Sequence, residues 1–377
     1  MQRNTPAPKE TKSLASQVKA KVNNTTVKKE KEYDGNFKTI ISTGSTLLDL
    51  AISGKRIHGG GMPGGIVVEA SGPSQSAKTV LLAETAGYVQ RKGGEAQFHD
   101  PEARLDQEFT AIFGMHIPKK NYYQPDTVTE VFSKVQKWLP KETEGIVNGI
   151  FVDSSAALST NLEMGNEDGD KMGGRRGKEF SEQLRKTCRI IKQKNYLMFF
   201  SNQIRDSFAS YGPKTTTPGG HAFEFYSSVR LRHGSPEKIY KVVKVAGKEV
   251  KKTIGIKVEI EVTKTVDEPY RKADIYVIYG YGIDDVRANL QFIKDFTRPI
   301  KTEEPVEAKK KVLAKGEVKE KSNSMYSCGG IPLAVSMDEA IYKVESQGLV
   351  NDLKEEVISL WESIEEKFTI EREPKQR

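Results

Sequence analysis

The sequence predicts an α/β fold in which helices cover both faces of a mostly parallel central sheet. Four short apolar runs are rich in strand-forming residues and bounded by turn residues, and they span residues 65–72, 95–100, 149–155 and 195–203. Segments with apolar residues at helical spacing separate these runs, at residues 78–91, 102–113, 128–139 and 178–194. Buried strands that alternate with helices form parallel sheets. Ligands of such sheets bind at the carboxyl ends of the strands.

The far edge of the sheet is expected to be antiparallel. Three further strand patterns follow at residues 226–233, 255–264 and 273–280. No helical pattern separates them, and consecutive strands without a helix between them pair as antiparallel neighbours. A chain of 377 residues is long enough for one large domain with appendages, and we assign the core of that domain to residues 38–300.

Charge and composition set this core apart from both ends of the chain. Residues 1–40 carry nine Lys or Arg against four Asp or Glu, so we expect residues 1–37 to form a basic N-terminal arm with one short helix. Residues 301–322 are charged and poor in apolar residues, which is typical of a linker. Residues 336–377 carry eleven acids against six bases, with apolar residues at helical spacing. Residues 323–377 are therefore predicted to form a small acidic helical region.

Composition argues against several classes of protein. No apolar run reaches the roughly 18 residues that a membrane-spanning helix needs, and the N-terminus lacks the apolar core of a signal peptide. The two cysteines, Cys188 and Cys328, are too few for a disulfide framework or a metal cluster. These features predict a protein of a reducing, cytoplasmic compartment. The formal net charge of +8 favours a nucleic-acid partner only slightly.

The stretch "GPSQSAKT" at residues 72–79 nearly matches the phosphate-binding loop G-x-x-x-x-G-K-[ST]. It follows an apolar strand and precedes a helical pattern, which is the structural context of that loop. Backbone N–H groups and the helix N-terminus would bind phosphates, and Lys78 would lie between the outer ones. The hydroxyl of Thr79 is available to magnesium. Gly72 matches the first glycine of the motif, but Ala77 replaces the second.

Ala77 leaves three interpretations open: a site that tolerates a methyl group, an inactive site, or a chance match. If the backbone needs a positive φ at this position, alanine costs about 1–2 kcal/mol relative to glycine. Contacts with triphosphate and magnesium are large enough to offset that amount. If the loop has an ordinary helical φ here, the alanine carries no such cost.

Acidic residues follow two of the predicted strands. Asp153 ends the apolar run in "FVDS", where nucleotide-binding sheets place the acid that supports magnesium. Alone, an aspartate there is more often a cap. "HDPEARLD" brings Asp100, Glu102 and Asp106 to the end of the neighbouring strand. One of these carboxylates would activate the attacking water, although Asp106 fits equally well as a first-turn acid that stabilises its helix.

There are two glycine-rich segments: residues 165–178 follow the strand that carries Asp153, and residues 205–221 follow the next strand. In the helix after the first segment, Lys178, Ser181 and Arg185 share one face. Glycines with cations, hydroxyls and a few aromatic side chains are typical of loops that bind a single-stranded nucleic-acid backbone. The alternative is a pair of solvent-exposed linkers.

Several motifs together resemble the RecA recombinase family. They include "ISTGSTLLDLAISG", "FVDSSAAL", "NQIR", "TTTPGGHAFEFYSSVRLR" and "YGYGI", and their order and spacing hold over residues 40–284. The alanine at position 77 resembles the phage UvsX branch of this family, as does the tail "IPLAVSMDEAIYKVESQG". The resemblance implies a P-loop NTPase core of the RecA type and a phage-encoded protein.

The resemblance also implies roles at the nucleotide site. Glu102 resembles the glutamate that activates water, and Gln203 resembles the residue that senses the γ-phosphate, so with Lys78 they form the implied catalytic set. Thr79 and Asp153 would hold Mg²⁺. The implied contacts with ATP are Gly72, Pro73, Ser74, Gln75, Ser76, Ala77, Lys78, Thr79, Asp106, Phe109 and Lys264. Lys264 would act on the neighbouring protomer, and it matches the family only after a shift of one residue.

The two glycine-rich segments resemble the first and second DNA-binding loops of the family. The DNA contacts implied by matching position are Met172, Gly173, Gly174, Arg175, Arg176, Lys178, Ser181, Arg185, Arg205, Tyr211, Gly219 and Gly220. The basic arm would serve oligomerisation or DNA capture.

The function implied is that of a DNA-dependent ATPase with ATP and Mg²⁺ as cofactors. It would form helical filaments on single-stranded DNA and pair that strand with homologous duplex DNA in recombination and repair, without a membrane. Its location would be a bacterial cytoplasm or a phage-infected host cell. The alternative is a non-hydrolysing recombination mediator or another RecA-like protein that binds single-stranded DNA. A hexameric helicase is disfavoured, because the resemblance includes both loops.

Overall fold

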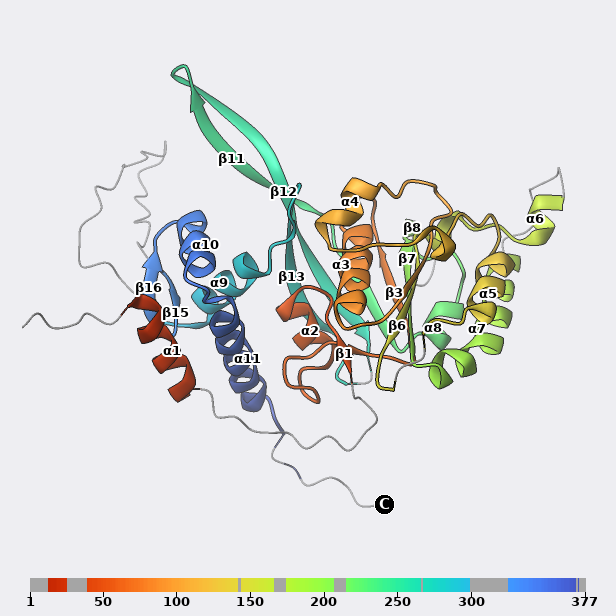
Figure 1. Ribbon diagram of the computed structural model, residues 1–377, viewed down its shortest axis with the longest axis horizontal. Helices are drawn as coiled ribbons and strands as arrows, with labels where there is room; N and C mark the ends of the chain where they lie inside the picture. Colours follow the sequence, from red (N-terminus) through yellow and green to blue (C-terminus); the bar gives the residue numbers. More distant parts are fainter. Residues whose placement is uncertain are drawn as a thin grey trace, which may run out of the picture. The chain divides into compact units, whose positions relative to one another are not determined.

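The computed structural model describes residues 13–25, 39–141, 144–165, 174–206, 215–265, 267–298, 325–370 and 372. The chain divides into two compact units, one of residues 31–285 and one of residues 1–30 with 286–377. Figure 1 labels many of the elements of both units. Among the described residues, no helix combines the length and apolar character needed to cross a membrane.

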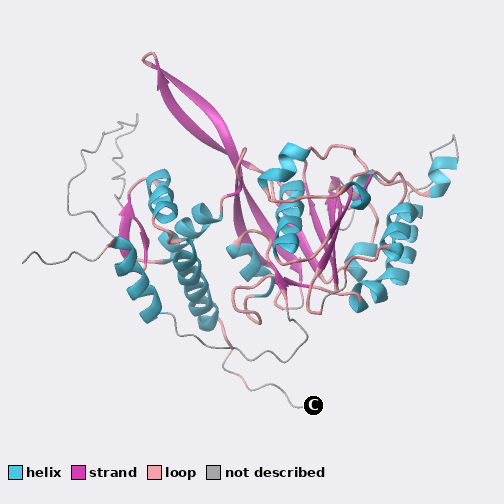
Figure 2. Cartoon of the chain, viewed as in Figure 1, coloured by secondary structure: helices cyan, strands magenta, loops and turns pink. Residues whose placement is uncertain are grey.

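A mixed sheet forms the centre of the larger unit, as the sequence predicts (Figure 2). Among the described residues its strand order is β14-β13-β12-β10-β3-β7-β6-β4-β5, and β11 pairs with β12. The six strands from β10 to β5 are parallel to one another. Their bounds are Ile66–Gly72 (β3), Ala96–His99 (β4), Tyr122–Tyr123 (β5), Asn148–Val152 (β6), Tyr196–Gln203 (β7) and Val229–His233 (β10).

Helices cover both faces of these parallel strands because apolar side chains alternate between the faces. Val67, Met198 and Phe200 join one buried cluster with residues of α5 (Val128–Lys137), α7 (Arg175–Gln193) and α8 (Ala222–Tyr226). The opposite face packs against α3 (Lys78–Arg91). A capping box of Thr127 and Glu130 starts α5, which stabilises its first turn. Further short elements are β1 (Ile40–Ile41), α2 (Thr46–Ser53), β2 (Met62–Pro63), η1 (Lys119–Asn121), η2 (Ser155–Ala157) and α6 (Asn161–Gly165).

One predicted helix is shorter than expected. The pattern at residues 102–113 gives only α4 (Gln107–Ile112). Ahead of it, the Asp100 carboxylate accepts a hydrogen bond from the Leu105 backbone N–H at 2.8 Å, and Ala103 has a positive φ of 51°. A side chain that bonds the backbone in this way competes with the first helical turn, so the acidic segment is a loop.

The far edge of the sheet is antiparallel, as predicted. It consists of β12 (Lys248–Lys264), β13 (Arg271–Ile278) and β14 (Gly282–Ile283). The hairpin of β11 (Glu237–Val245) with the first half of β12 was not predicted. Its side chains are mostly exposed on both faces, so it lacks the burial alternation that marks a strand in sequence. Ala246 and Gly247 close it with φ angles of 50° and 79°, as a two-residue hairpin turn requires.

The smaller unit joins both ends of the chain. It contains α1 (Leu14–Thr25), α9 (Asp285–Phe296), the hairpin of β15 (Tyr326–Cys328) and β16 (Ile331–Ala334), α10 (Met337–Ser346) and α11 (Val350–Lys367). Val18 and Val22 of α1 are buried, and α1 packs on α11.

The unit boundaries differ from the sequence assignment at two places. The helix of the N-terminal arm belongs to the smaller unit, because its two buried valines form an apolar stripe. The helix α9, assigned to the core, also belongs there: Arg287 donates a hydrogen bond to Asp338 at 3.1 Å, and Gln291 accepts one from Tyr326 at 3.4 Å. The predicted linker, residues 301–322, lies outside the described residues.

Candidate nucleotide site and nucleic-acid interface

The phosphate-binding loop connects the end of β3 to the start of α3. Gln75 and Ala77 both have positive φ angles, of 61° and 64°, and α3 continues from Lys78 in right-handed conformation. Left-handed residues next to right-handed ones turn successive N–H groups toward one concave side, which is how backbone binds phosphate. The loop therefore has a backbone shape suited to binding phosphate.

Ala77 has a positive φ, the conformation in which alanine is strained. Its φ of 64° and ψ of 19° lie in the left-handed region, and no side chain caps the helix at this position. Alanine in this conformation costs about 1–2 kcal/mol relative to glycine. The fold therefore holds the loop in shape in spite of the methyl group.

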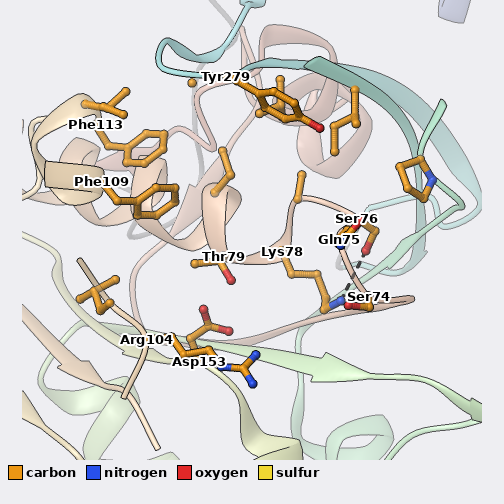
Figure 3. Close-up of a pocket in the computed structure, with 18 of the residues that line it drawn as sticks. Ser74, Gln75, Ser76, Lys78, Thr79, Arg104, Phe109, Phe113, Asp153 and Tyr279 are labelled. Carbon is orange, nitrogen blue, oxygen red and sulfur yellow. Dashed lines mark hydrogen bonds between the residues drawn. The ribbon is translucent and has the colours of Figure 1, made fainter. Parts of the chain in front are cut away.

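Lys78 is folded back onto the loop that precedes it. Its Nζ donates hydrogen bonds to the carbonyl oxygens of Gly72 at 3.0 Å and Pro73 at 2.6 Å. It also lies 3.4 Å from Ser76 Oγ (Figure 3). Burial lowers the pKa of Lys78, while the carboxylates of Asp153 and Glu102 oppose this shift. The Lys78 ammonium beside the carboxylates of Asp153 and Glu102 is suited to a phosphate group that binds together with a metal cation.

A cavity of about 730 Å³ opens above this loop. It brings together most of the residues predicted for nucleotide binding and hydrolysis: Ser74, Gln75, Ser76, Ala77, Lys78, Thr79, Glu102, Phe109, Asp153 and Gln203. The register of the sheet brings Gln203 next to the start of the phosphate-binding loop, because Gly72 of β3 pairs with Gln203 of β7. The volume suits a nucleotide-sized ligand.

One end of the cavity is apolar. Phe109 and Phe113 pack edge to face on the side of α4, with ring centroids 4.9 Å apart, and Tyr279 lines another wall (Figure 3). Ile256 and Ile278 from the antiparallel strands also line the cavity. Flat aromatic and branched walls suit a nucleobase, while the phosphate-binding loop lies at the polar end. Tyr279 was not assigned to the site, although it lies in the quoted motif "YGYGI".

Asp153 and Glu102 meet at the polar end. Burial raises the pKa of Asp153, and hydrogen bonds from Ser201 and Thr79 partly oppose the rise. Glu102 accepts a hydrogen bond from Ser154 Oγ at 3.4 Å and pairs with Arg104 at 2.8 Å. The Asp153 backbone N–H donates to the His99 carbonyl oxygen at 2.9 Å, which joins the ends of the two strands that carry these acids.

The donor set fits magnesium in the way nucleotide sites use it. No group of three or more His, Cys, Asp or Glu able to hold a metal occurs in the described part of the chain. Mg²⁺ in such sites takes one or two protein oxygens and completes its shell with phosphate and water. The Thr79 hydroxyl, with Asp153 bonded to it, supplies that minimum.

Three predicted nucleotide contacts, Gly72, Pro73 and Asp106, do not line the cavity. Lys264 does not line it either, but its predicted contact is with the nucleotide of a neighbouring protomer and stays a prediction. Gly72 and Pro73 lie beneath it and bind Lys78 through their carbonyl oxygens. Asp106 caps α4 by accepting a hydrogen bond from the Glu108 N–H at 3.1 Å, which is the helix-stabilising alternative weighed above. Lys264 donates to the carbonyl oxygen of Glu224 at 2.6 Å, because β12 carries it beside α8.

The two glycine-rich segments adjoin at their described ends. A Cβ added at Gly177, in the first turns of α7, would lie 3.1 Å from the Gly219 carbonyl oxygen. Gly219 itself has a φ of 97°, and a Cβ there would lie 2.9 Å from the ring of Phe223. Glycine at position 177 therefore allows the two segments to approach closely, and glycine at position 219 allows the turn to pack on Phe223. Gly177 is not among the DNA contacts that the sequence implies.

The cations of α7 differ in their availability. Arg175, Lys178 and Arg185 are exposed. Together with Gly174, Ser181 and Gly220, they make up the part of the candidate nucleic-acid interface that the structure describes. Arg176 instead pairs with Glu163 at 3.4 Å and donates to the Ala156 carbonyl oxygen at 3.2 Å. Met172, Gly173 and Tyr211 lie outside the described residues, as does the side chain of Arg205, whose backbone forms β8 (Arg205–Asp206) beside β9 (Thr215–Thr216).

Comparison with known proteins agrees with this architecture. The model of the RecA N-terminal domain matches residues 10–284. Protein RecA of Thermus thermophilus is 35% identical over 252 residues, which is 66% of this chain and 69% of the relative. Protein RecA of Borrelia duttonii is 37% identical over 251 residues, 66% of this chain and 65% of the relative. With a family model that covers the whole sheet and both candidate sites, the chain belongs to the RecA family.

Proposed function

We propose that the protein is an ATP-dependent recombinase that forms filaments on single-stranded DNA and pairs that strand with homologous duplex DNA. The observation that carries this proposal is a short connection between the two candidate sites. Gln203 lines the cavity, and its backbone N–H donates to Asn202 Oδ1 at 3.0 Å. The Asn202 side chain in turn donates to the Pro218 carbonyl oxygen at 3.0 Å, directly before Gly219.

This connection supports control of DNA binding by nucleotide. A change at Gln203 that accompanies contact with the terminal phosphate would move the Asn202 backbone, and the Asn202 amide would transmit the change to the glycine turn beside α7. A ligand shifts such an equilibrium only through contacts that differ between the two states. Hydrolysis removes the terminal phosphate and thereby weakens the filament, which permits turnover.

The residues at the polar end have separate tasks in hydrolysis. Lys78 and the loop N–H groups bind the outer phosphates, and Glu102 accepts a proton from the attacking water. Thr79 and Asp153 would hold Mg²⁺, which when bound supplies positive charge to the phosphates. The cavity walls at Phe109 and Tyr279 position the base.

Turnover of ATP measured with and without single-stranded DNA tests this function and separates it from the mediator alternative. We expect magnesium-ATP to bind at millimolar concentration or below, and DNA to stimulate its hydrolysis. Pairing of a labelled single strand with a homologous duplex should require the nucleotide. A protein that binds DNA but does not hydrolyse ATP would be a mediator, and the proposal would fail.

Arg205→Ala tests the DNA interface. Removing one phosphate contact should weaken binding to all single-stranded sequences alike and lower the slope of log affinity against log salt by about one counter-ion, roughly 0.7. Lys137→Ala, at the exposed end of α5, removes the same charge away from both glycine-rich segments and should leave the slope unchanged. An equal slope in the parent and Arg205→Ala proteins would remove Arg205 from the interface.

A further inference from the structure

His233 lies at the end of β10, against the phosphate-binding loop. Its side chain is buried, and its Nδ1 lies 2.6 Å from the carbonyl oxygen of Ser76. A carbonyl oxygen only accepts hydrogen bonds, so Nδ1 carries the proton and donates. The oxygen that it binds belongs to the peptide group between Ser76 and Ala77.

The rest of the surroundings holds His233 in this position. A Cβ added at Gly72 would lie 2.6 Å from the His233 Cβ, so the glycine at the start of the loop lets β10 approach closely. Burial lowers the pKa of His233 to about 4; the hydrogen bond to Ser76 opposes this shift, and the nearby Lys78 charge adds to it. The imidazole is therefore neutral at pH 7. Among the described residues its Nε2 has no hydrogen-bond partner, which leaves the bond to Ser76 as its polar contact.

The orientation of the Ser76–Ala77 peptide group determines the conformation of Ala77. Rotation of this group about the chain would carry φ of Ala77 from its present 64° toward negative values, where alanine is unstrained. The same rotation would turn the Ser76 carbonyl oxygen away from His233 and leave a buried N–H donor without a partner. The loss of a buried hydrogen bond is comparable in free energy to the strain of left-handed alanine.

We propose that His233 compensates for the missing second glycine of the phosphate-binding loop by holding the Ser76 carbonyl oxygen, which keeps Ala77 in the left-handed conformation that phosphate binding needs. His233 is then a positioning residue and touches no nucleotide. The inference rests on the proposed function only in taking magnesium-ATP as the ligand of the loop.

A double-mutant cycle of His233→Leu and Ala77→Gly tests the proposal. Leucine fills similar space without a donor. Once the bond is lost, the strain of alanine would reduce the population of the left-handed loop, and the apparent affinity would fall by the same factor. With Ala77 present, we expect His233→Leu to weaken magnesium-ATP binding about fivefold to thirtyfold. In the Ala77→Gly protein, the same change should weaken binding less than about threefold, because glycine adopts the left-handed conformation without strain.

Each protein is measured for magnesium-ATP affinity and for its urea unfolding midpoint. Packing alone would lower the midpoint and affect affinity equally in both backgrounds, so an equal loss of affinity in the parent and Ala77→Gly backgrounds overturns the proposal. His233→Asn keeps an amide donor near the place of Nδ1 and should retain affinity within about threefold of the parent. If His233→Leu does not fold, His233→Asn takes its place in the test. The proposal is then overturned if His233→Asn loses magnesium-ATP affinity and the added Ala77→Gly change does not restore it. A parent protein that binds no ATP refutes the proposed function instead.

Discussion

Glu102→Gln is expected to reduce ATP turnover by about 10²–10⁴, the usual contribution of a general base. The amide keeps the size of the side chain and an oxygen that accepts the hydrogen bond from Ser154 Oγ. What it loses is the negative charge that attracts the proton of water. Affinity for magnesium-ATP and for DNA should therefore stay close to that of the parent, so the change should appear in kcat.

Glu108→Gln is the matched control for this experiment. Glu108 lies in the first turn of α4, after the loop that carries Glu102; it is exposed and does not line the cavity. The same neutralisation there should leave turnover unchanged. Turnover of Glu102→Gln within a factor of two of the parent would remove Glu102 from the catalytic role.

Arg230→Met is expected to lower the free energy of unfolding by about 3–5 kcal/mol, the cost of leaving one member of a buried ion pair without its partner. The carboxylate of Glu69 is fully buried in the centre of the sheet, and Arg230 Nε lies 2.7 Å from its Oε2. Asn202 donates to the other oxygen at 2.9 Å. Methionine removes the charge while keeping most of the side-chain volume, so the loss is electrostatic.

Lys272→Met is the control, because it breaks an exposed pair in the same sheet. Lys272 and Glu259 are 2.8 Å apart with side chains 54% and 53% exposed, and pairs of this kind contribute about 0–1 kcal/mol. Urea unfolding of both variants gives the comparison. A loss below about 1 kcal/mol for Arg230→Met would mean that water or Asn202 satisfies the Glu69 carboxylate without the arginine.

The order of strands and helices, and the chemistry of the polar end, could be predicted from the sequence. Apolar runs and helical spacing are local signals, and parallel strands have one edge where their carboxyl ends meet. The sequence alone therefore places Glu102, Lys78 and Asp153 together. The family motifs added Phe109 and Gln203, which local patterns alone do not single out. A phage origin, which the alanine at position 77 suggested, stays a prediction.

Elements that depend on contacts distant in the chain could not be predicted in this way. The β11–β12 hairpin gains its order from strand pairing and not from burial, and α1 forms part of the smaller unit because two valines pack against that unit. Asp106 has the residue type of a ligand, but a backbone N–H two residues later determines its role as a cap.

The conformation of Ala77 is determined by tertiary contacts and not by the local sequence. The motif by itself left open a working phosphate site, an inactive site or a chance match, and it left the φ angle of Ala77 undecided. Only the tertiary structure decided the angle, because the group that opposes rotation of the peptide is His233, which is 157 residues from Ser76 in the chain. Nothing in the residues around position 77 specifies such a donor. A hydrogen bond between distant segments can stabilise a conformation that its own residue disfavours, and only the packed sheet brings the two together.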